Sequence, residues 1–213
     1  MQFLVTLMLG AAAALPSATA GAYEPCGSLE TGYGPFDYRT QKKKLEIVER
    51  FHFQSDVEFP SVTRKLPLGA PLDYTLHASP NHHRALAAIA KLDLKIRQKD
   101  GYVSLKTGLM KGADYTAPCY FDRAIRFAPD DGMVRMIYAQ YLLKVGEKDA
   151  GMKQIEISRT LDTDNANLQY NLGLLYFDLK DYDNALLHAK KAYEMGFSLP
   201  GLREKLQKVK KWQ

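Results

Sequence analysis

The second half of the sequence repeats with a period of 34 residues. Gly173 lies one period after Ala139, Ala192 lies one period after Ser158, and Ser158 lies one period after Ala124. Small residues at such positions allow two helices to pack closely. Because the register holds across three units without an insertion or deletion, we expect an all-α array of stacked helix pairs.

Two complete helix pairs and one interrupted pair follow from this register. The complete pairs are predicted at 133–145 with 148–161 and at 166–179 with 182–195. In the preceding unit, the first helix is predicted at 81–96 and the second at 115–128. A glycine-rich insertion near 99–114 separates these two helices, in place of the usual short turn.

Two sets of residues carry the pattern of a known repeat family. They are Ala117, Phe121, Ala124 and Pro129, and then Leu172, Gly173, Tyr176, Ala185, Ala189 and Ala192. Their spacing resembles the tetratricopeptide repeat, in which a proline closes the second helix. The resemblance implies an array of about three units over 81–199. The segment 200–213, with Leu202 and Leu206 on one helical stripe, is predicted to be a basic C-terminal capping helix.

The segment 21–80 shows little regular pattern. A short helix is predicted at 41–50 and an extended stretch at 51–53, and prolines interrupt the residues that follow. A long segment with few elements needs a surface to pack on. We therefore expect a mostly irregular N-terminal arm that lies along the array.

Short motifs in the first half carry a second resemblance. They are Cys26-Gly27, Gly34-Pro35-Phe36-Asp37-Tyr38-Arg39, Val48-Glu49, Asp73-Tyr74-Thr75-Leu76 and Pro80-Asn81-His82-His83-Arg84-Ala85-Leu86. Together with the repeats, they resemble a family of exported tetratricopeptide-repeat proteins from Gram-negative bacteria. This resemblance implies a compartment and a fold, but no activity.

The first 20 residues have the pattern of a secretion signal. An apolar stretch runs from Phe3 to Leu15, and Ala18-Thr19-Ala20 provides a cleavage site, so we predict a signal peptide at 1–20. A cut after Ala22 and a buried N-terminal helix are the alternatives. The stretch is too short for a permanent transmembrane anchor. The expected location is therefore the periplasm or the extracellular medium.

Export determines how the two cysteines are interpreted. In an oxidising compartment, Cys26 and Cys119 most simply form one disulfide, with two free thiols as the alternative. Such a bond would fasten the arm to the middle of the array. Chain-entropy models give about 4–5 kcal/mol as the upper limit of its contribution.

The net charge of +5 comes almost wholly from the end of the chain. Residues 203–211 hold five basic side chains and one acidic side chain. So local an excess does not predict a nucleic-acid partner. Contact of this basic helix with a membrane surface is an alternative to its role as a cap, and we favour the cap.

The histidines are the main candidates for chemistry. His82 and His83 are neighbours, so a helix would point them about 100° apart. His77 could join His82, but no carboxylate at a useful spacing completes a metal site with these histidines. We expect Asn81 to cap a helix and the histidines to bond to the arm. Asp130-Asp131-Gly132 is predicted to be a turn between repeats rather than a calcium loop. No metal, cofactor or catalytic residue is therefore predicted. An enzyme or metal-handling protein that uses His77, His82 and His83 is the alternative.

The inner face of the first helices is the candidate binding surface. Tetratricopeptide arrays commonly hold an extended peptide there, and the register places nine residues on it. They are Met133, Met136, Gln140, Leu143, Asn167, Tyr170, Asn171, Leu174 and Phe177. The predicted function is a non-catalytic, exported module for protein or peptide binding, and cell-envelope assembly is the setting that compartment and fold suggest. The partner and the oligomeric state are not predicted, and a groove filled by the arm is an alternative.

Overall fold

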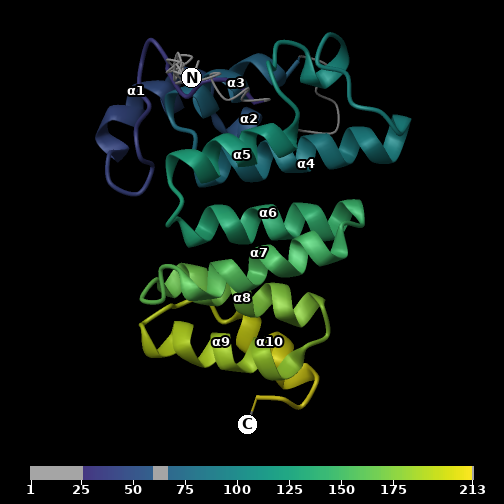
Figure 1. The fold of residues 1–213 in the computed structure, drawn as a ribbon. Helices are drawn as coiled ribbons and strands as arrows, with labels where there is room; N and C mark the ends of the chain where they lie inside the picture. Colours follow the sequence, from purple (N-terminus) through teal and green to yellow (C-terminus); the bar gives the residue numbers. More distant parts are fainter. Residues whose placement is uncertain (1–25, 60–66, 213) are drawn as a thin grey trace, which may run out of the picture.

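The computed structural model describes residues 26–59 and 67–212, and within them the chain is all-helical, without a strand. The predicted signal peptide at 1–20 lies outside the described residues. The helices follow one another in layers from the N-terminal to the C-terminal end of the molecule (Figure 1). Within the described residues, no helix is both long and apolar enough to cross a membrane.

Helices α1 to α5 form the N-terminal layer. Their bounds are α1 Lys42–His52, α2 Ser55–Glu58, α3 Gly69–Ala78, α4 His83–Asp100 and α5 Ala117–Phe127. The predicted insertion lies between α4 and α5 and contains a short 3-10 turn, η1, at Gly108–Met110. The predicted interruption of the first helix pair is therefore present, and α4 and α5 match its two helices.

The following layers are two complete helix pairs. They are α6 Gly132–Val145 with α7 Lys148–Thr160, and α8 Ala166–Asp178 with α9 Tyr182–Glu194. The backbone repeats with the sequence: Asp131 and Asn165 cap the first helices, and Gly146 and Lys180 end them with positive φ angles of 93° and 63°. These bounds agree with the predicted pairs, and the helical repeat array is confirmed.

Small residues bring the helices of each pair together. A Cβ atom on Gly173 would stand 2.5 Å from Leu202 Cδ2 and 3.3 Å from the Ala185 carbonyl oxygen. Ser158 replaces an alanine of the repeat pattern, and its hydroxyl donates a 2.8 Å hydrogen bond to the Gly132 carbonyl. The small residues therefore recur every 34 positions because the space between packed helices at these points leaves no room for a larger side chain.

About half of the described residues of 21–80 are helical, in α1, α2 and α3, so the arm is more regular than predicted. Helix α1 continues to His52, where an extended stretch was expected. Its apolar side chains Leu45 and Val48 pack against Ala78 of α3, and this burial favours the helix. Pro71 lies in the first turn of α3, where its missing N–H breaks no helical bond.

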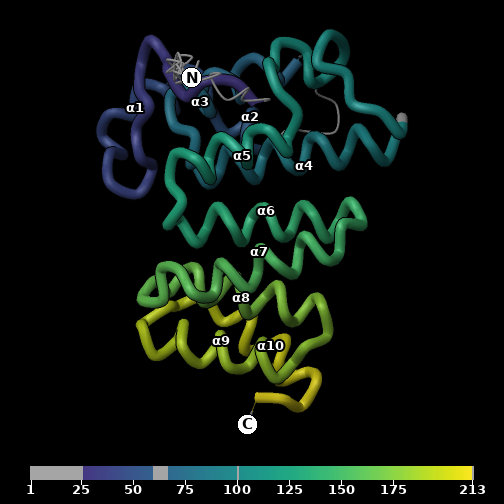
Figure 2. Tube along the Cα trace, viewed as in Figure 1, coloured from purple at the N-terminus to yellow at the C-terminus, as the bar shows by residue number. Residues whose placement is uncertain are grey.

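The described part of the arm packs on the array, as predicted, and does so at its N-terminal end, where α2 contacts α4 (Figure 2). Apolar side chains of the arm, among them Phe53, Val57 and Leu72, belong to the main core. Helix α1 also packs on α3 through a small cluster of its own.

The predicted disulfide joins Cys26 to Cys119 in α5. Two arginines of α5 bind the backbone beside it. Arg123 donates to the carbonyl oxygens of Cys26, at 3.2 Å, and Ser28, and Arg126 donates to that of Gly27 at 2.8 Å. The start of the described chain is thereby fastened to α5 by one covalent bond and several polar ones.

Helix α10, Gly201–Lys208, closes the C-terminal end of the array. Leu202 and Leu206 are fully buried against α8 and α9, whereas the basic side chains of this helix are exposed. The predicted capping helix at 200–213 is therefore present, although it ends at Lys208.

Candidate functional site

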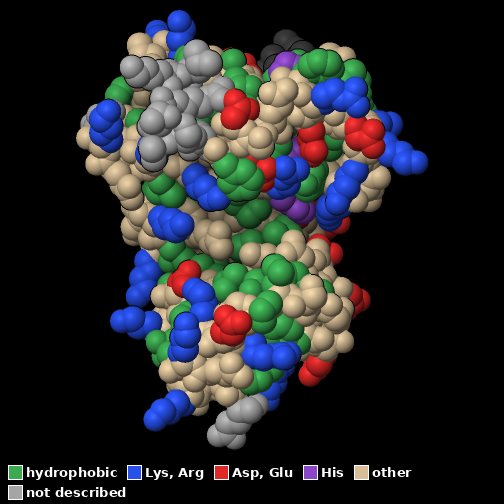
Figure 3. Space-filling view, turned by 180° about the vertical axis from the view of Figure 1, so that it is seen from behind, with side chains coloured by type: hydrophobic (Ala, Val, Ile, Leu, Met, Phe, Trp, Pro, Cys, Tyr) green, Lys and Arg blue, Asp and Glu red, His purple; other side chains and the backbone are tan. Residues whose placement is uncertain are grey.

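A hollow of about 620 Å³ lies where the arm meets the first helices of three successive units. Helices α4, α6 and α8 contribute the array side, and the arm contributes one rim. The lining residues are Tyr38, Arg39, Lys42 and Glu58 from the arm, His83, Arg84, Ala87, Ala88 and Lys91 from α4, Met133, Met136, Ile137 and Gln140 from α6, and Asn165, Asn167 and Asn171 at α8. Seen from behind, the surface narrows between the upper and lower layers, and apolar and basic side chains adjoin that waist (Figure 3).

Five of the nine residues predicted for the inner face line this hollow. They are Met133, Met136, Gln140, Asn167 and Asn171. All five lie on α6 or α8, the two first helices for which the repeat register predicted an inner face. Whether the hollow holds a peptide remains a prediction.

The other four residues pack elsewhere. Leu143 lies against Gly151 of α7. Tyr170 stacks on Phe197 with ring centroids 4.2 Å apart, and its hydroxyl accepts a hydrogen bond from the Leu202 N–H.

Phe177 and Leu174 complete this set. The Phe177 ring lies 5.2 Å from Lys205 Nζ of α10, and Leu174 packs against the main core. Tyr170 and Phe177 thus contact the C-terminal segment, because the capping helix covers the part of α8 that a further repeat would otherwise contact. The predicted groove is shorter than expected at this end.

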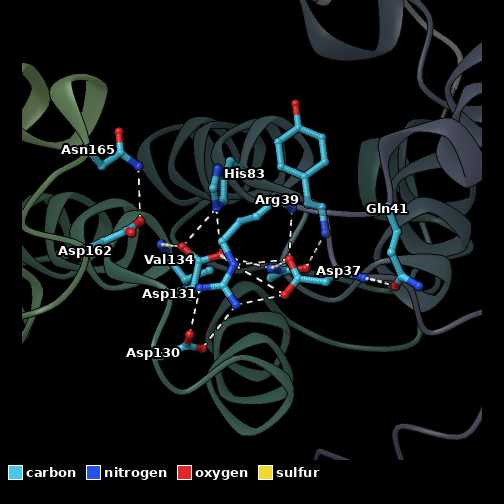
Figure 4. A network of polar contacts seen from close by, with 11 residues as sticks. Asp37, Arg39, Gln41, His83, Asp130, Asp131, Val134, Asp162 and Asn165 are labelled. Carbon is cyan, nitrogen blue, oxygen red and sulfur yellow. Dashed lines mark hydrogen bonds and ion pairs between the residues drawn. The ribbon is translucent and has the colours of Figure 1, made fainter.

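One rim of the hollow is a polar network that joins the arm to α6 (Figure 4). The Arg39 guanidinium bonds Asp37 Oδ2 at 2.8 Å and Asp130 Oδ2 at 3.0 Å. Asn81 donates to both Asp37 and Asp131 at 2.9 Å, and His83 Nε2 lies 2.8 Å from Asp131 Oδ2. The network fixes the position of the arm relative to the array.

Electrostatics keep this rim ionised. Burial alone would raise the pKa of Asp37, but hydrogen bonds from Arg39 and Asn81 outweigh it and lower the pKa to about 2. The Arg39 hydrogen bond also lowers the pKa of Asp130. Asp131 is fully buried and caps α6 by accepting from the Val134 N–H. The predicted turn between repeats is therefore confirmed, with an added role in anchoring the arm.

Two lysines at the hollow, Lys42 and Lys91, form no ion pair within 4 Å of a carboxylate among the described residues. Lys42 Nζ lies 5.4 Å from the Tyr38 ring centroid, and Lys91 Nζ lies 6.0 Å from that of Phe59. By contrast, Arg84 is paired with Glu58. The hollow therefore combines an apolar floor with two lysine ammonium groups, of which Lys42 also interacts electrostatically with Glu49. Sequence analysis missed both lysines, because Lys42 comes from the arm and Lys91 from a helix assigned no inner-face residues.

The three candidate histidines do not form one site. His82 Nε2 bonds Glu49 of the arm at 2.9 Å, His83 bonds Asp131, and His77 bonds Asp73. His82, rather than Asn81, caps α4, by accepting from the Ala85 N–H. The cap prediction for Asn81 is wrong because its side chain is used by the network.

Burial explains the state of His82. The side chain is fully buried, and this burial lowers its pKa although Glu49 favours the charged form. Within the described residues, one group of three side chains is close enough to share an ion, and it contains His77 with Asp73 and Asp114. The statement that no carboxylate accompanies these histidines is therefore wrong for His77.

Comparison with known proteins assigns no family to the chain. No family model and no solved structure matches it. Over 85 residues it is 27% identical to DnaJ homolog subfamily C member 3 of Mus musculus, a match that covers 39% of this chain and 17% of that protein. The chain thus spans under a fifth of the mouse protein. This similarity and the helical repeat fold are compatible with a protein-interaction module.

Proposed function

We propose that this protein is an exported, non-catalytic interaction module that holds an extended segment of a partner protein in the central hollow. The observation that carries the proposal is the lining: first helices of three successive units contribute to one hollow. Extended peptides bind well to such surfaces because side-chain amides can bond their backbone while apolar pockets take their side chains.

The chemistry of the lining supports this choice. Met133 and Met136 line the hollow as nearly buried side chains, and their flexible thioethers can adapt to a bound segment. Gln140 makes no hydrogen bond to another described residue, so its amide is available to a peptide backbone. Lys42 and Lys91 favour a segment that carries negative charge. The partner we propose is therefore an extended segment with apolar and acidic side chains.

Export and a role in cell-envelope assembly belong to the same proposal. The apolar stretch and the Ala18-Thr19-Ala20 site support secretion, and the disulfide between Cys26 and Cys119 is compatible with an oxidising compartment. The mass of the protein recovered from outside the cytoplasm tests this part. We expect a chain that begins at Gly21, whereas an unprocessed chain in the cytoplasm would contradict it.

Selection from a library of displayed peptides tests the binding site. We expect enriched peptides to combine apolar and acidic residues and to bind the intact chain with micromolar affinity. The variant Gln140→Trp fills the hollow and should weaken binding by at least about tenfold, since 1.4 kcal/mol corresponds to that factor. Lys190→Trp, on the exposed side of α9, is the matched control and should bind normally. Equal binding by both variants would place the peptide elsewhere.

A further inference from the structure

Helix α3 presents an acid and a histidine on one face. Asp73 and His77 are four residues apart, the spacing at which two helical side chains point the same way. Asp114, from the end of the insertion, approaches the same point. One ligand atom from each of these three residues lies within 4.8 Å of the other two.

The His77 ring is oriented for coordination through Nε2. Its Nδ1 lies 3.0 Å from the Asp73 carbonyl oxygen, an arrangement that places the proton on Nδ1. Nε2 is then left facing Asp114 Oδ2, at 3.9 Å. Two atoms that each lie about 2.1 Å from one ion can be at most about 4.2 Å apart, so this separation allows a shared ion.

The Asp73 carboxylate is held by further hydrogen bonds. Its Oδ1 accepts from the Tyr120 hydroxyl and, at 3.1 Å, from the Asp114 N–H. Its Oδ2 lies 3.2 Å from His77 Nδ1. Supporting bonds of this kind fix ligand geometry in metal sites.

From this geometry, we propose that Asp73, His77 and Asp114 bind a divalent transition-metal ion, for which Zn²⁺ is the probe. Two carboxylates balance the charge of such an ion, and the imidazole favours it over Mg²⁺ and Ca²⁺. Three protein ligands leave a fourth position for water or an exogenous group. The ion links α3 to the insertion, and this site is separate from the hollow and independent of peptide binding.

Titration of the full chain, purified without an affinity tag, tests the site. We expect calorimetry to show one Zn²⁺ per chain with micromolar or tighter affinity, together with a rise in melting temperature. Asp114→Asn and His77→Gln should each weaken binding by at least about tenfold. The Asp114 side chain is exposed, so its variant tests the ligand without a folding defect. His52→Gln is the matched control and should bind as the unaltered chain does.

Two results would overturn the proposal. One is the absence of Zn²⁺ binding at micromolar concentrations by the folded chain. The other is unaltered affinity in Asp114→Asn together with His77→Gln, which would place the ion at another group.

Discussion

The two halves of the molecule are held together in different ways. In the repeats from α6 to α9, capping residues and small residues recur every 34 positions and set the bounds of each helix. Asp131 and Asn165, which cap α6 and α8, are one such pair. In the N-terminal half, the decisive contacts join residues far apart in sequence. His82 bonds Glu49, Arg39 bonds Asp130, and Cys26 is linked to Cys119.

This difference affects both stability and function. Repeats with mainly local and neighbouring contacts gain stability unit by unit, whereas long-range links make the N-terminal half depend on a few individual bonds. The central hollow lies at the junction, with one rim from each kind of structure. Four changes test the comparison, from the largest expected effect to the smallest.

Loss of the disulfide should have the largest effect, and chiefly on the N-terminal half. The bond joins residues 93 positions apart, and a loop of this size contributes about 4 kcal/mol to the free energy of unfolding. In the double variant Cys26→Ser and Cys119→Ser, hydrogen exchange should accelerate in α3 and α5 well before α8 and α9. Uniform acceleration throughout the chain would contradict the comparison.

A cavity in the repeats should have a smaller and more local effect. Leu172 is 0% exposed, and Leu172→Ala should lower the free energy of unfolding by about 3 kcal/mol. Exchange should rise in α8, α9 and α10 while α4 and α5 keep their protection. Leu187→Ala, at a position 48% exposed, is the control and should change stability by less than about 0.5 kcal/mol. Loss of protection in α4 would show that the halves do not unfold separately.

Acid should destabilise the repeats through His188. This side chain is 3% exposed, and burial lowers its pKa to about 4. The unfolded chain takes up the proton near pH 6.5 and the folded chain only near pH 4, so stability falls as the pH drops through this window. The expected loss is about 2 kcal/mol by pH 4.5.

Denaturation at several pH values checks this effect. His188→Gln should reduce the pH dependence between 6.5 and 4.5 by about 2 kcal/mol and leave the part that comes from His82, whose pKa burial also lowers. The control His52→Gln should retain the full dependence. An unchanged slope in His188→Gln would refute the assignment.

The smallest effect is expected at the rim of the hollow. Arg39→Gln removes the bridge between Asp37 and Asp130, and about 1 kcal/mol of stability should be lost, because these groups are partly solvated. Faster hydrogen exchange in α1 should accompany this loss of stability. Arg159→Gln breaks a surface pair with Glu156 in the repeats and should cost less than about 0.5 kcal/mol. Equal losses of stability in the two variants would contradict the claim that the Arg39 network stabilises the molecule more than an ordinary surface ion pair does.

Sequence reasoning succeeded where the determinants are local. The pairs α6–α7 and α8–α9 were predictable because small residues, caps and turns recur at one period. Helix α3 was not predicted because the prolines of this segment were interpreted as breaks, although Pro71 lies in its first turn, where proline is tolerated.

The candidate sites show the same limit. Met136 and Gln140 follow from the register, but Lys42 reaches the hollow only through the tertiary position of the arm. At the second site, Asp73 and His77 stand four residues apart, but they share a face only because this segment forms helix α3, which the sequence did not predict. Asp114, 41 residues beyond Asp73, joins them only through the path of the insertion.

Site-specific photo-crosslinking in living cells tests the central claim, that the hollow holds a partner segment. A photoreactive benzoylphenylalanine at Asn167 faces the hollow, and the same residue at Lys190 lies on exposed α9. We predict a crosslinked protein partner from position 167 that is absent from position 190 and is lost when Gln140→Trp is added. A partner captured equally at both positions, or captured at 167 despite Gln140→Trp, would contradict the account.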